Sequence, residues 1–341
     1  MPQRLELMGV PGSPYTRKML ALLRYRHIPY SVIWAGYRVP PEGYPRPKVK
    51  LLPTVFFPET DGSLTPAVDS TPIIRRLEKD YAGRAALPVD PELQFYCDLI
   101  EDYADEWLTK PMFHYRWYHA PDRANAGPMI AYWSVNTSPR QDAEAFSDQI
   151  TKTQFERLYV VGSNEVTART IEDSYIRFLR ILDVLLQIRG YVLGARPSAA
   201  DFAIYGQLTQ LGVIEPTSAA IMARDFPRVR AWVDLVEDLS GLKSNGAEWF
   251  SPEEARAALG PLLSEIGRVY IPFLLANAAA AERSDGSLSA EIDGRTWTQP
   301  TFPYQVKCLE ALRNSVASLP ESPKQAVAAV LALAGCAGLS L

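Results

Sequence analysis

The pattern of hydrophobic residues changes once along this 341-residue chain, and this change constrains the fold more than any other feature. Up to about residue 82, short runs rich in β-branched and aromatic residues alternate with helical segments. From about residue 91 onward, apolar residues recur with the helical period of 3.6. The sequence therefore predicts an α/β domain followed by a larger all-α part.

The first part reads as strand, helix, strand, loop, strand, strand and helix. Strands are expected at residues 4–8, 30–34, 54–57 and 63–68, with helices at about 14–23 and 70–77 and a surface loop at 36–48. Residues 58–62 carry the turn residues of a hairpin between the last two strands. This order is that of thioredoxin, in which the first helix directs its N-terminus at the functional site.

A linker by composition at 83–91 separates a thioredoxin-like domain at 1–82 from the helical part, which comprises a domain at 91–241 and a helical extension at 242–341. Helices are expected at 93–108, at 171–186 with an end at Gly190, and at 200–211 after a capping motif, Ser198 to Asp201. In the extension, helices are expected near 252–279, 303–319 and 322–333. Residues 285–300 are interpreted as a polar excursion between the first two of these.

Charge and composition exclude several classes of function. A net charge of -4 without a long Lys/Arg block argues against nucleic-acid binding. The N-terminal segment lacks the apolar core of a signal peptide, so a cytoplasmic location is expected. The most apolar stretch, residues 326–341, is too short to span a bilayer, so no membrane insertion is expected.

Nothing in the sequence predicts a metal centre or a redox pair. The three cysteines are widely separated and are expected to be buried, inert thiols. His114 and His119 are five residues apart, which suits neither one face of a helix nor a usual metal-binding pair. No nucleotide-binding, metalloprotease or serine hydrolase motif occurs.

Ser13-Pro14-Tyr15-Thr16 stands at the first loop-to-helix junction, where a redox protein of this fold carries two cysteines. A hydroxyl cannot exchange disulfides, but it can donate a hydrogen bond to a bound thiolate, with added positive potential from the helix N-terminus and from Arg17 or Lys18. Such a site lowers the pKa of a ligand's thiol. Alternatively, Ser13 only caps the helix.

Two further segments are candidates for ligand binding. A cis Leu52–Pro53 bond would present the backbone of Leu52 to an extended peptide ligand, whereas a trans proline would simply begin the strand. Asp69 and Ser70 precede the next helix, where Ser70 and helix N–H groups suit a carboxylate and Asp69 suits an ammonium group. The alternative is again a plain helix cap.

Taken together, residues 13–18, 52–55, 69–73 and 191–202 resemble the glutathione S-transferase superfamily over about residues 5–239. The resemblance implies a glutathione-binding domain, a helical domain for the electrophile, and a homodimer. It also implies that Ser13 activates the sulfur, with Tyr15 as the alternative. Leu52 with Pro53 would form the backbone clamp, and Asp69 with Ser70 the γ-glutamyl site.

The expected function is therefore that of a glutathione transferase, with glutathione as co-substrate and a small hydrophobic or aromatic electrophile. Lyase, isomerase and dehalogenase variants share the first step. Phe113, Tyr115 and Trp117 are candidates for the electrophile pocket, or else for an aromatic core cluster. The alternative function is a non-catalytic, glutathione transferase-like ligand carrier or scaffold.

Overall fold

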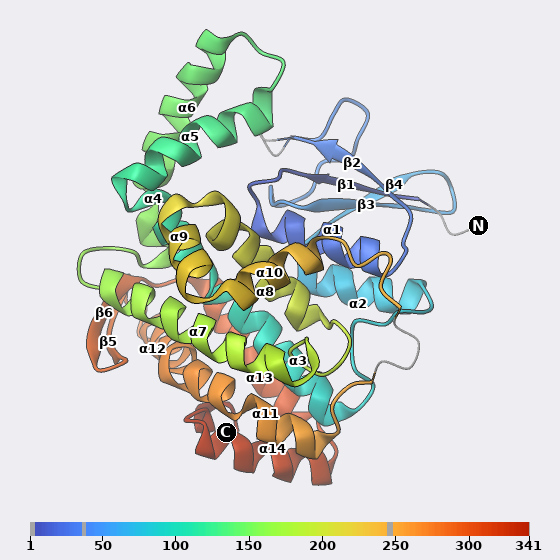
Figure 1. Ribbon diagram of the computed structural model, residues 1–341, viewed down its shortest axis with the longest axis vertical. Helices are drawn as coiled ribbons and strands as arrows, with labels where there is room; N and C mark the ends of the chain where they lie inside the picture. Colours follow the sequence, from blue (N-terminus) through green and yellow to red (C-terminus); the bar gives the residue numbers. More distant parts are fainter. Residues whose placement is uncertain (1–3, 36–38, 244–247, 341) are drawn as a thin grey trace.

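The computed structural model describes residues 4–35, 39–243 and 248–340, and Figure 1 shows how the elements are arranged. The strands are β1 Leu5–Gly9, β2 Tyr30–Trp34, β3 Thr54–Pro58, β4 Leu64–Val68, β5 Ser287–Ile292 and β6 Arg295–Pro300. The helices are α1 Pro14–Tyr25, α2 Ser70–Asp80, α3 Pro91–Glu106, α4 Thr109–Trp117, α5 Ala120–Val135, α6 Arg140–Phe155, α7 Ala168–Arg189, α8 Ala199–Thr209, α9 Pro216–Asp225, α10 Pro227–Glu237, α11 Pro252–Glu265, α12 Ile271–Glu282, α13 Pro303–Ala317 and α14 Glu321–Leu333. Short 3₁₀ segments lie at Leu158–Val161 and Ala337–Leu339, and π-helical segments at Gln210–Ile214 and Ile266–Tyr270.

The first four strands form one mixed sheet with the order β2-β1-β3-β4. Strand β1 pairs parallel with β2 and antiparallel with β3, and β3 pairs antiparallel with β4. Thr54 at the start of β3 is opposite both Met8 and Val68. Consequently the end of β1, the start of β3 and the end of β4 meet at one edge of the sheet. The thioredoxin-like arrangement expected from the sequence is confirmed.

Helix α1 connects the N-terminal domain to the helical part. Ser13 caps it, Pro14 occupies its first turn, and most of its side chains are buried. It packs against α8, where Gly206 has no side chain to separate the two backbones. A Cβ atom at Gly206 would lie 2.5 Å from the carbonyl oxygen of Pro14, so the close approach requires glycine.

The helical part largely follows the predicted periodicity. Helix α3 matches the expected amphipathic helix at 93–108 to within two residues, α7 ends at Gly190 with a φ of 86°, and α8 begins with the complete Ser198–Asp201 capping box. In Figure 1 these helices form a body below and beside the sheet, while α5 and α6 project from one end.

The C-terminal extension packs onto this body. Helix α11 lies against α7, and α13 and α14 lie against α3. An aromatic cluster joins the extension to the helical domain. The ring centroid of Trp107, the C-cap of α3, lies 5.3 Å from that of Trp297 and 5.9 Å from that of Phe273. All three are buried, so the extension shares one core with the helical domain.

The extension corrects one expectation, because residues 285–300 form the β5–β6 hairpin and not a polar excursion. Leu288, Ile292 and Trp297 alternate with polar residues and turn inward, which gives a polar composition with one buried face. Asp293 and Gly294 both have positive φ, 54° and 70°, as a two-residue hairpin turn requires. The Asp-Gly pair was the signal in the sequence for this hairpin.

One continuous helical stretch, Pro252–Glu282, is long and apolar enough to cross a membrane by length and composition. Of its most apolar window, 61% is buried within the fold, as in the core helix of a globular protein.

Candidate functional site

The sheet edge described above gathers the segments that the sequence singled out. The loop from Val10 to Ser13 follows β1, the Leu52–Pro53 bond precedes β3, and Asp69 follows β4. The Leu52–Pro53 bond is cis, which is the first of the two alternatives considered from the sequence. The N-termini of α1 and α2 begin at this same edge, so both helix dipoles place positive potential there.

Ser13 is half-buried and caps α1. Its Oγ atom accepts a hydrogen bond from the backbone N–H of Thr16 at 3.3 Å. A serine hydroxyl has one donor and two acceptor positions, so accepting this bond leaves its own proton available to another group. Capping the helix and donating to a bound sulfur are therefore compatible roles for Ser13.

Tyr15 is differently placed. Its hydroxyl donates a hydrogen bond to the backbone carbonyl of Asp105 at 2.8 Å, at the end of α3. Burial, together with the nearby carboxyl groups of Glu106 and Asp105, raises the Tyr15 pKa well above its ordinary value. The phenol thus stays protonated, and its proton is engaged by the backbone.

Asp69 and Ser70 begin α2. The Asp69 carboxylate accepts from the backbone N–H of Thr71 at 3.2 Å, with a φ of 75° at Asp69 itself. Ser70 is buried and accepts a hydrogen bond from the ammonium group of Lys18 at 2.9 Å. As at Ser13, this bond leaves the hydroxyl proton of Ser70 able to donate to an anionic group.

Lys18 is itself fully buried, which the sequence did not reveal. Its Nζ atom pairs with Glu101 at 2.8 Å and with Asp105 at 2.6 Å. Burial favours the neutral form of Glu101, but Lys18 and Arg75 overcome it and lower the Glu101 pKa to about 2. Lys18 therefore does not face the ligand edge directly, but holds Ser70 against α3.

The loop before Ser13 is anchored by residues of the helical domain and by Arg17 of α1. Arg116 of α4 is buried and donates to the carbonyl of Gly12 at 2.8 Å, while also pairing with Glu215 at 2.6 Å. Gln210 and Arg17 both donate to the carbonyl of Pro11. These bonds fix the backbone that carries Ser13.

The extension reaches the same site. Tyr304, in the first turn of α13, donates to the Asp69 carboxylate at 3.3 Å, and its neighbour Gln305 donates to Glu106 at 3.1 Å.

Glu106 and Asp102 have neutral hydrogen-bond donors, Gln305 and Tyr270. The pKa of Glu106 is raised to about 8, mainly by burial and secondly by repulsion from the carboxylates of Asp102 and Asp105.

Residues 112–117 of the aromatic segment lie on their own helix, α4, and not at the end of the preceding long helix α3. Tyr115 is 3% exposed and Trp117 1% exposed, so both lie in the hydrophobic core, the second of the two roles considered from the sequence. Phe113 is half-buried beside Trp117.

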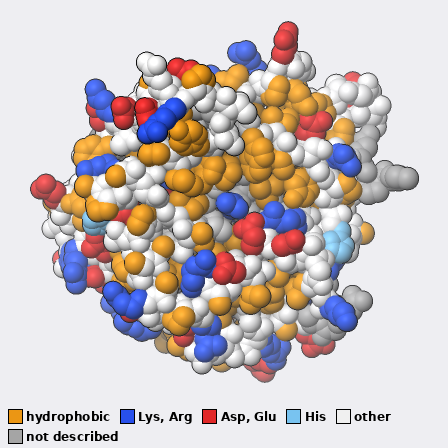
Figure 2. Space-filling model, turned by 45° about the horizontal axis from the view of Figure 1, so that its top comes forward, with side chains coloured by type: hydrophobic (Ala, Val, Ile, Leu, Met, Phe, Trp, Pro, Cys, Tyr) orange, Lys and Arg blue, Asp and Glu red, His pale blue; other side chains and the backbone are white. Residues whose placement is uncertain are grey.

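Sequence reasoning missed Trp133 on α5. Its ring lies so close to Gly12 that a Cβ atom there would be 2.6 Å from it, which places this half-buried indole beside Ser13. Met129 and Tyr132 are exposed on the same helix. Figure 2, turned to bring the end with α5 and α6 forward, shows hydrophobic side chains gathered on this face, with charged groups between them.

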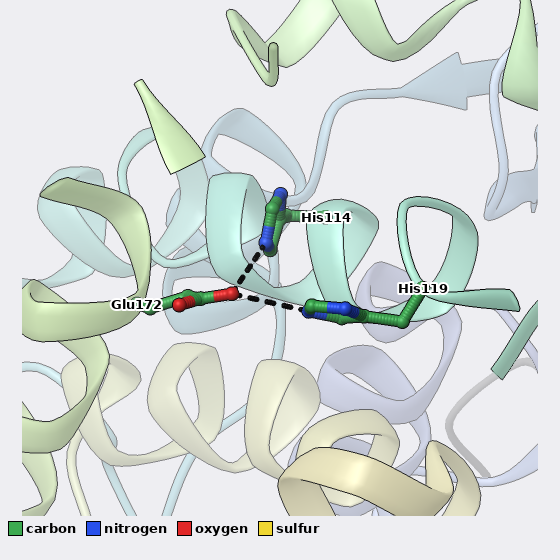
Figure 3. A group of neighbouring side chains, drawn as sticks. All are labelled: His114, His119 and Glu172. Atoms are coloured by element: carbon green, nitrogen blue, oxygen red, sulfur yellow. Dashed lines mark hydrogen bonds and ion pairs between the residues drawn. The ribbon is translucent and has the colours of Figure 1, made fainter. Parts of the chain in front are cut away.

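The two histidines on α4 and at its end do come together, contrary to the expectation from their spacing. Both Nε2 atoms contact the same oxygen of Glu172, at 3.2 Å from His114 and 3.1 Å from His119 (Figure 3). Helix α4 ends at Trp117, and His119 adopts an extended conformation as the N-cap of α5. Because the chain leaves the helix, a five-residue spacing does not separate the rings.

The cysteines and a hollow near the start of α3 are less suited to chemistry. The three cysteines are buried, as expected, and burial raises the pKa of each thiol. An open hollow of about 750 Å³ is lined by residues near the start of α3 and by Trp249 and Phe250, and includes none of the residues predicted for the site.

A mixed four-stranded sheet with a serine-capped first helix, a cis-proline before β3 and a following helical domain defines a thioredoxin-like protein of the two-domain type. Residues 7–85 match the family model for the glutathione S-transferase N-terminal domain, and residues 166–235 match that for the C-terminal domain. These two segments of the chain are therefore assigned to the N-terminal and C-terminal domains of glutathione S-transferases.

Solved structures with similarity to this chain include three bacterial proteins. A glutathione S-transferase of Methylobacterium radiotolerans in complex with glutathione sulfonate is 17% identical, with 69% of this chain and 91% of that chain covered at a TM-score of 0.38. A glutathione transferase of Burkholderia graminis with two glutathione molecules per subunit is 18% identical (69% and 83% covered, TM-score 0.37). One of Pseudomonas putida with a glutathione disulfide is 17% identical (69% and 91%, TM-score 0.35). No curated protein matches the chain by sequence.

Proposed function

We propose that the chain is a glutathione transferase in which the sheet edge binds reduced glutathione and Ser13 donates a hydrogen bond to its thiolate. The observation that carries this proposal is the β1-β3-β4 register, which brings Ser13, the cis Leu52–Pro53 bond and Asp69 to one edge. These three segments match a ligand with a thiol, a peptide backbone and an amino-acid end.

The cysteinyl backbone, the γ-glutamyl end and the thiol of glutathione each have a group to receive them. The backbone of Leu52 pairs with the cysteinyl part, as an added strand does. Asp69 accepts from the γ-glutamyl ammonium group, while Ser70 and the N-terminus of α2 donate to its carboxylate. The proton of Ser13 then stabilises the thiolate, which lowers the thiol pKa and makes the sulfur the nucleophile.

Ser13 is favoured over Tyr15 because the Tyr15 hydroxyl already donates to the Asp105 carbonyl. The electrophile lies against Trp133, whose ring borders Gly12 next to Ser13, with Phe113 as a further apolar contact. Holding the thiolate and an apolar electrophile together supplies the rate enhancement of a thiol addition or substitution.

The test is titration of reduced glutathione into wild type and Ser13→Ala, with the bound thiolate followed by ultraviolet absorbance across pH. Ser251→Ala is a matched control, because Ser251 caps α11 with the same bond, 3.2 Å from the N–H of Glu254, far along the chain from this site. Both variants lose a helix cap, worth about 1 kcal/mol.

Only Ser13→Ala is expected to return the bound thiol pKa toward its free value, with Tyr15→Phe leaving it low. A thiol pKa unchanged in Ser13→Ala would reject Ser13 as the activating group. Absence of glutathione binding in the wild type would instead favour the ligand-carrier or scaffold alternative.

A further inference from the structure

We infer that His114, His119 and Glu172 form a binding site for a divalent transition-metal ion of the zinc type, separate from the site at Ser13. Among the described residues, one ring nitrogen of each histidine and a carboxylate oxygen of Glu172 all lie within 4.8 Å of one another. The side chains come from α4, the N-cap of α5 and α7, and they converge on one point (Figure 3).

The distances fit a shared ion. Each nitrogen lies 3.1–3.2 Å from the same Glu172 oxygen. Zinc bonds of about 2.0–2.1 Å place neighbouring ligands of a tetrahedron roughly 3.3 Å apart. The two nitrogen–oxygen separations are therefore close to the tetrahedral edge before any side chain moves.

The buried ligand is already oriented. The other ring nitrogen of His114, Nδ1, is 2.7 Å from the hydroxyl of Ser163, and the ring stacks on Tyr118 with centroids 4.5 Å apart. A second hydrogen bond of this kind is what sets the tautomer and ring plane of metal-binding histidines. It leaves Nε2 directed at Glu172.

The site is open on one side, since the side chains of His119 and Glu172 are 30% and 29% exposed while His114 is enclosed. An ion can enter from solvent and keep a water molecule as its fourth ligand. Two imidazoles and one carboxylate favour zinc, cobalt or nickel over magnesium and calcium, which prefer sites made of oxygen ligands.

The test uses Zn²⁺ and Co²⁺ alone, added to the chelator-treated full chain at neutral pH. We expect one Zn²⁺ per chain, and visible absorption of tetrahedral Co²⁺. The chain has three histidines, so nitrogen-resolved NMR should show two imidazoles shifting on Zn²⁺ addition and the third, His27, unchanged.

Substitutions at the partly exposed ligands avoid disturbing the core. His119→Ala and Glu172→Gln should each weaken Zn²⁺ binding by about 100-fold or more, and Ser163→Ala, which removes only the orienting bond, by roughly 10-fold. His27→Ala is the matched control, because His27 is exposed and contacts the carbonyl of Ser240.

Binding that is unchanged in both His119→Ala and Glu172→Gln would overturn the proposal. So would NMR signals of His114 and His119 that stay in place at saturating Zn²⁺, which would leave the cluster as two hydrogen bonds to Glu172 only. Neither result depends on whether glutathione binds.

Discussion

Glu101 and Glu106 are five residues apart on α3, and their surroundings have opposite effects on the same chemical group. Glu101 faces Lys18 and Arg75, and those two cations lower its pKa to about 2. Glu106 faces the extension, where its donor is the neutral amide of Gln305, and burial raises its pKa to about 8. Helix α3 thus has a charged side toward the N-terminal domain and a side toward the extension that favours protonated carboxyl groups.

The two sides of α3 differ in whether charged carboxylates stabilise the contact or oppose it. On the first side, the ion pairs hold α1, α2 and α3 together and orient Ser70. On the second side, ionisation of Glu106 and of Asp102, whose pKa burial raises to about 7, opposes the packing of α13. Docking of the extension is therefore expected to weaken as the pH rises through 7 to 8, while the ion pairs of Glu101 persist down to well below pH 4.3.

The largest effect is expected from Lys18→Met, which leaves Glu101 and Asp105 buried with one cation fewer. We expect a loss of about 3–5 kcal/mol in the free energy of unfolding at pH 7, measured by urea denaturation. Lys79→Met, at an exposed lysine of α2, should change it by less than about 0.5 kcal/mol. Equal urea midpoints for the two variants would contradict this account.

Glu101→Gln should have the next largest effect, about 2–3 kcal/mol of destabilisation at pH 7. Because the pKa of Glu101 is lowered in the folded state, its stabilising contribution is present above about pH 4.3 and is lost as the pH falls toward 2. The deficit of the variant relative to wild type should therefore shrink with acid. A stability deficit of Glu101→Gln that stayed constant down to pH 2.5 would show that the charge of Glu101 does not cause the stabilisation.

Glu106→Gln should have the opposite sign. A raised pKa in the folded state means that stability is complete below about pH 4.3 and declines as the pH rises to about 8. The variant, which cannot ionise, should be more stable than wild type by roughly 1–3 kcal/mol at pH 8 and about equal at pH 4. Glu310→Gln, at an exposed position of α13, provides the control. A Glu106→Gln variant that is less stable than wild type at pH 8 would contradict the opposite effects inferred for Glu101 and Glu106.

The smallest effect is expected from Tyr304→Phe, which removes one partly exposed hydrogen bond to Asp69. Stability should fall by less than about 1 kcal/mol, and glutathione affinity should change by a few-fold as Asp69 loses a competing donor. Tyr159→Phe is a matched control, since Tyr159 is 50% exposed and Tyr304 is 48% exposed. Identical glutathione affinities in the two variants would show that Tyr304 of the extension does not influence glutathione binding at Asp69.

The parts of the structure that the sequence predicted well are those determined by local pattern. The four strands, the capping serines and the hairpin at 58–62 depend on neighbours within a few residues, and all were placed to within about two residues. The thioredoxin order then brought Ser13, Pro53 and Asp69 together without further information.

The rest depends on residues that are distant in the chain. Nothing near Glu106 in sequence indicates that Gln305 will lie beside it, and nothing near Gly12 indicates that Trp133 of α5 will lie against it. His119 was misjudged because helical spacing was assumed to continue past Trp117. In each case the missing information was the direction in which the chain leaves a helix.

The register between Met8, Thr54 and Val68 sets different tolerances for insertions on either side of Thr54. Residues added between β2 and β3 lengthen a surface loop and leave the pairing in phase. One residue added inside β3 turns every following side chain to the opposite face of the sheet and shifts the strand's start relative to its neighbours. Length variation among related chains should therefore collect before Leu52, with β3 itself kept at constant length.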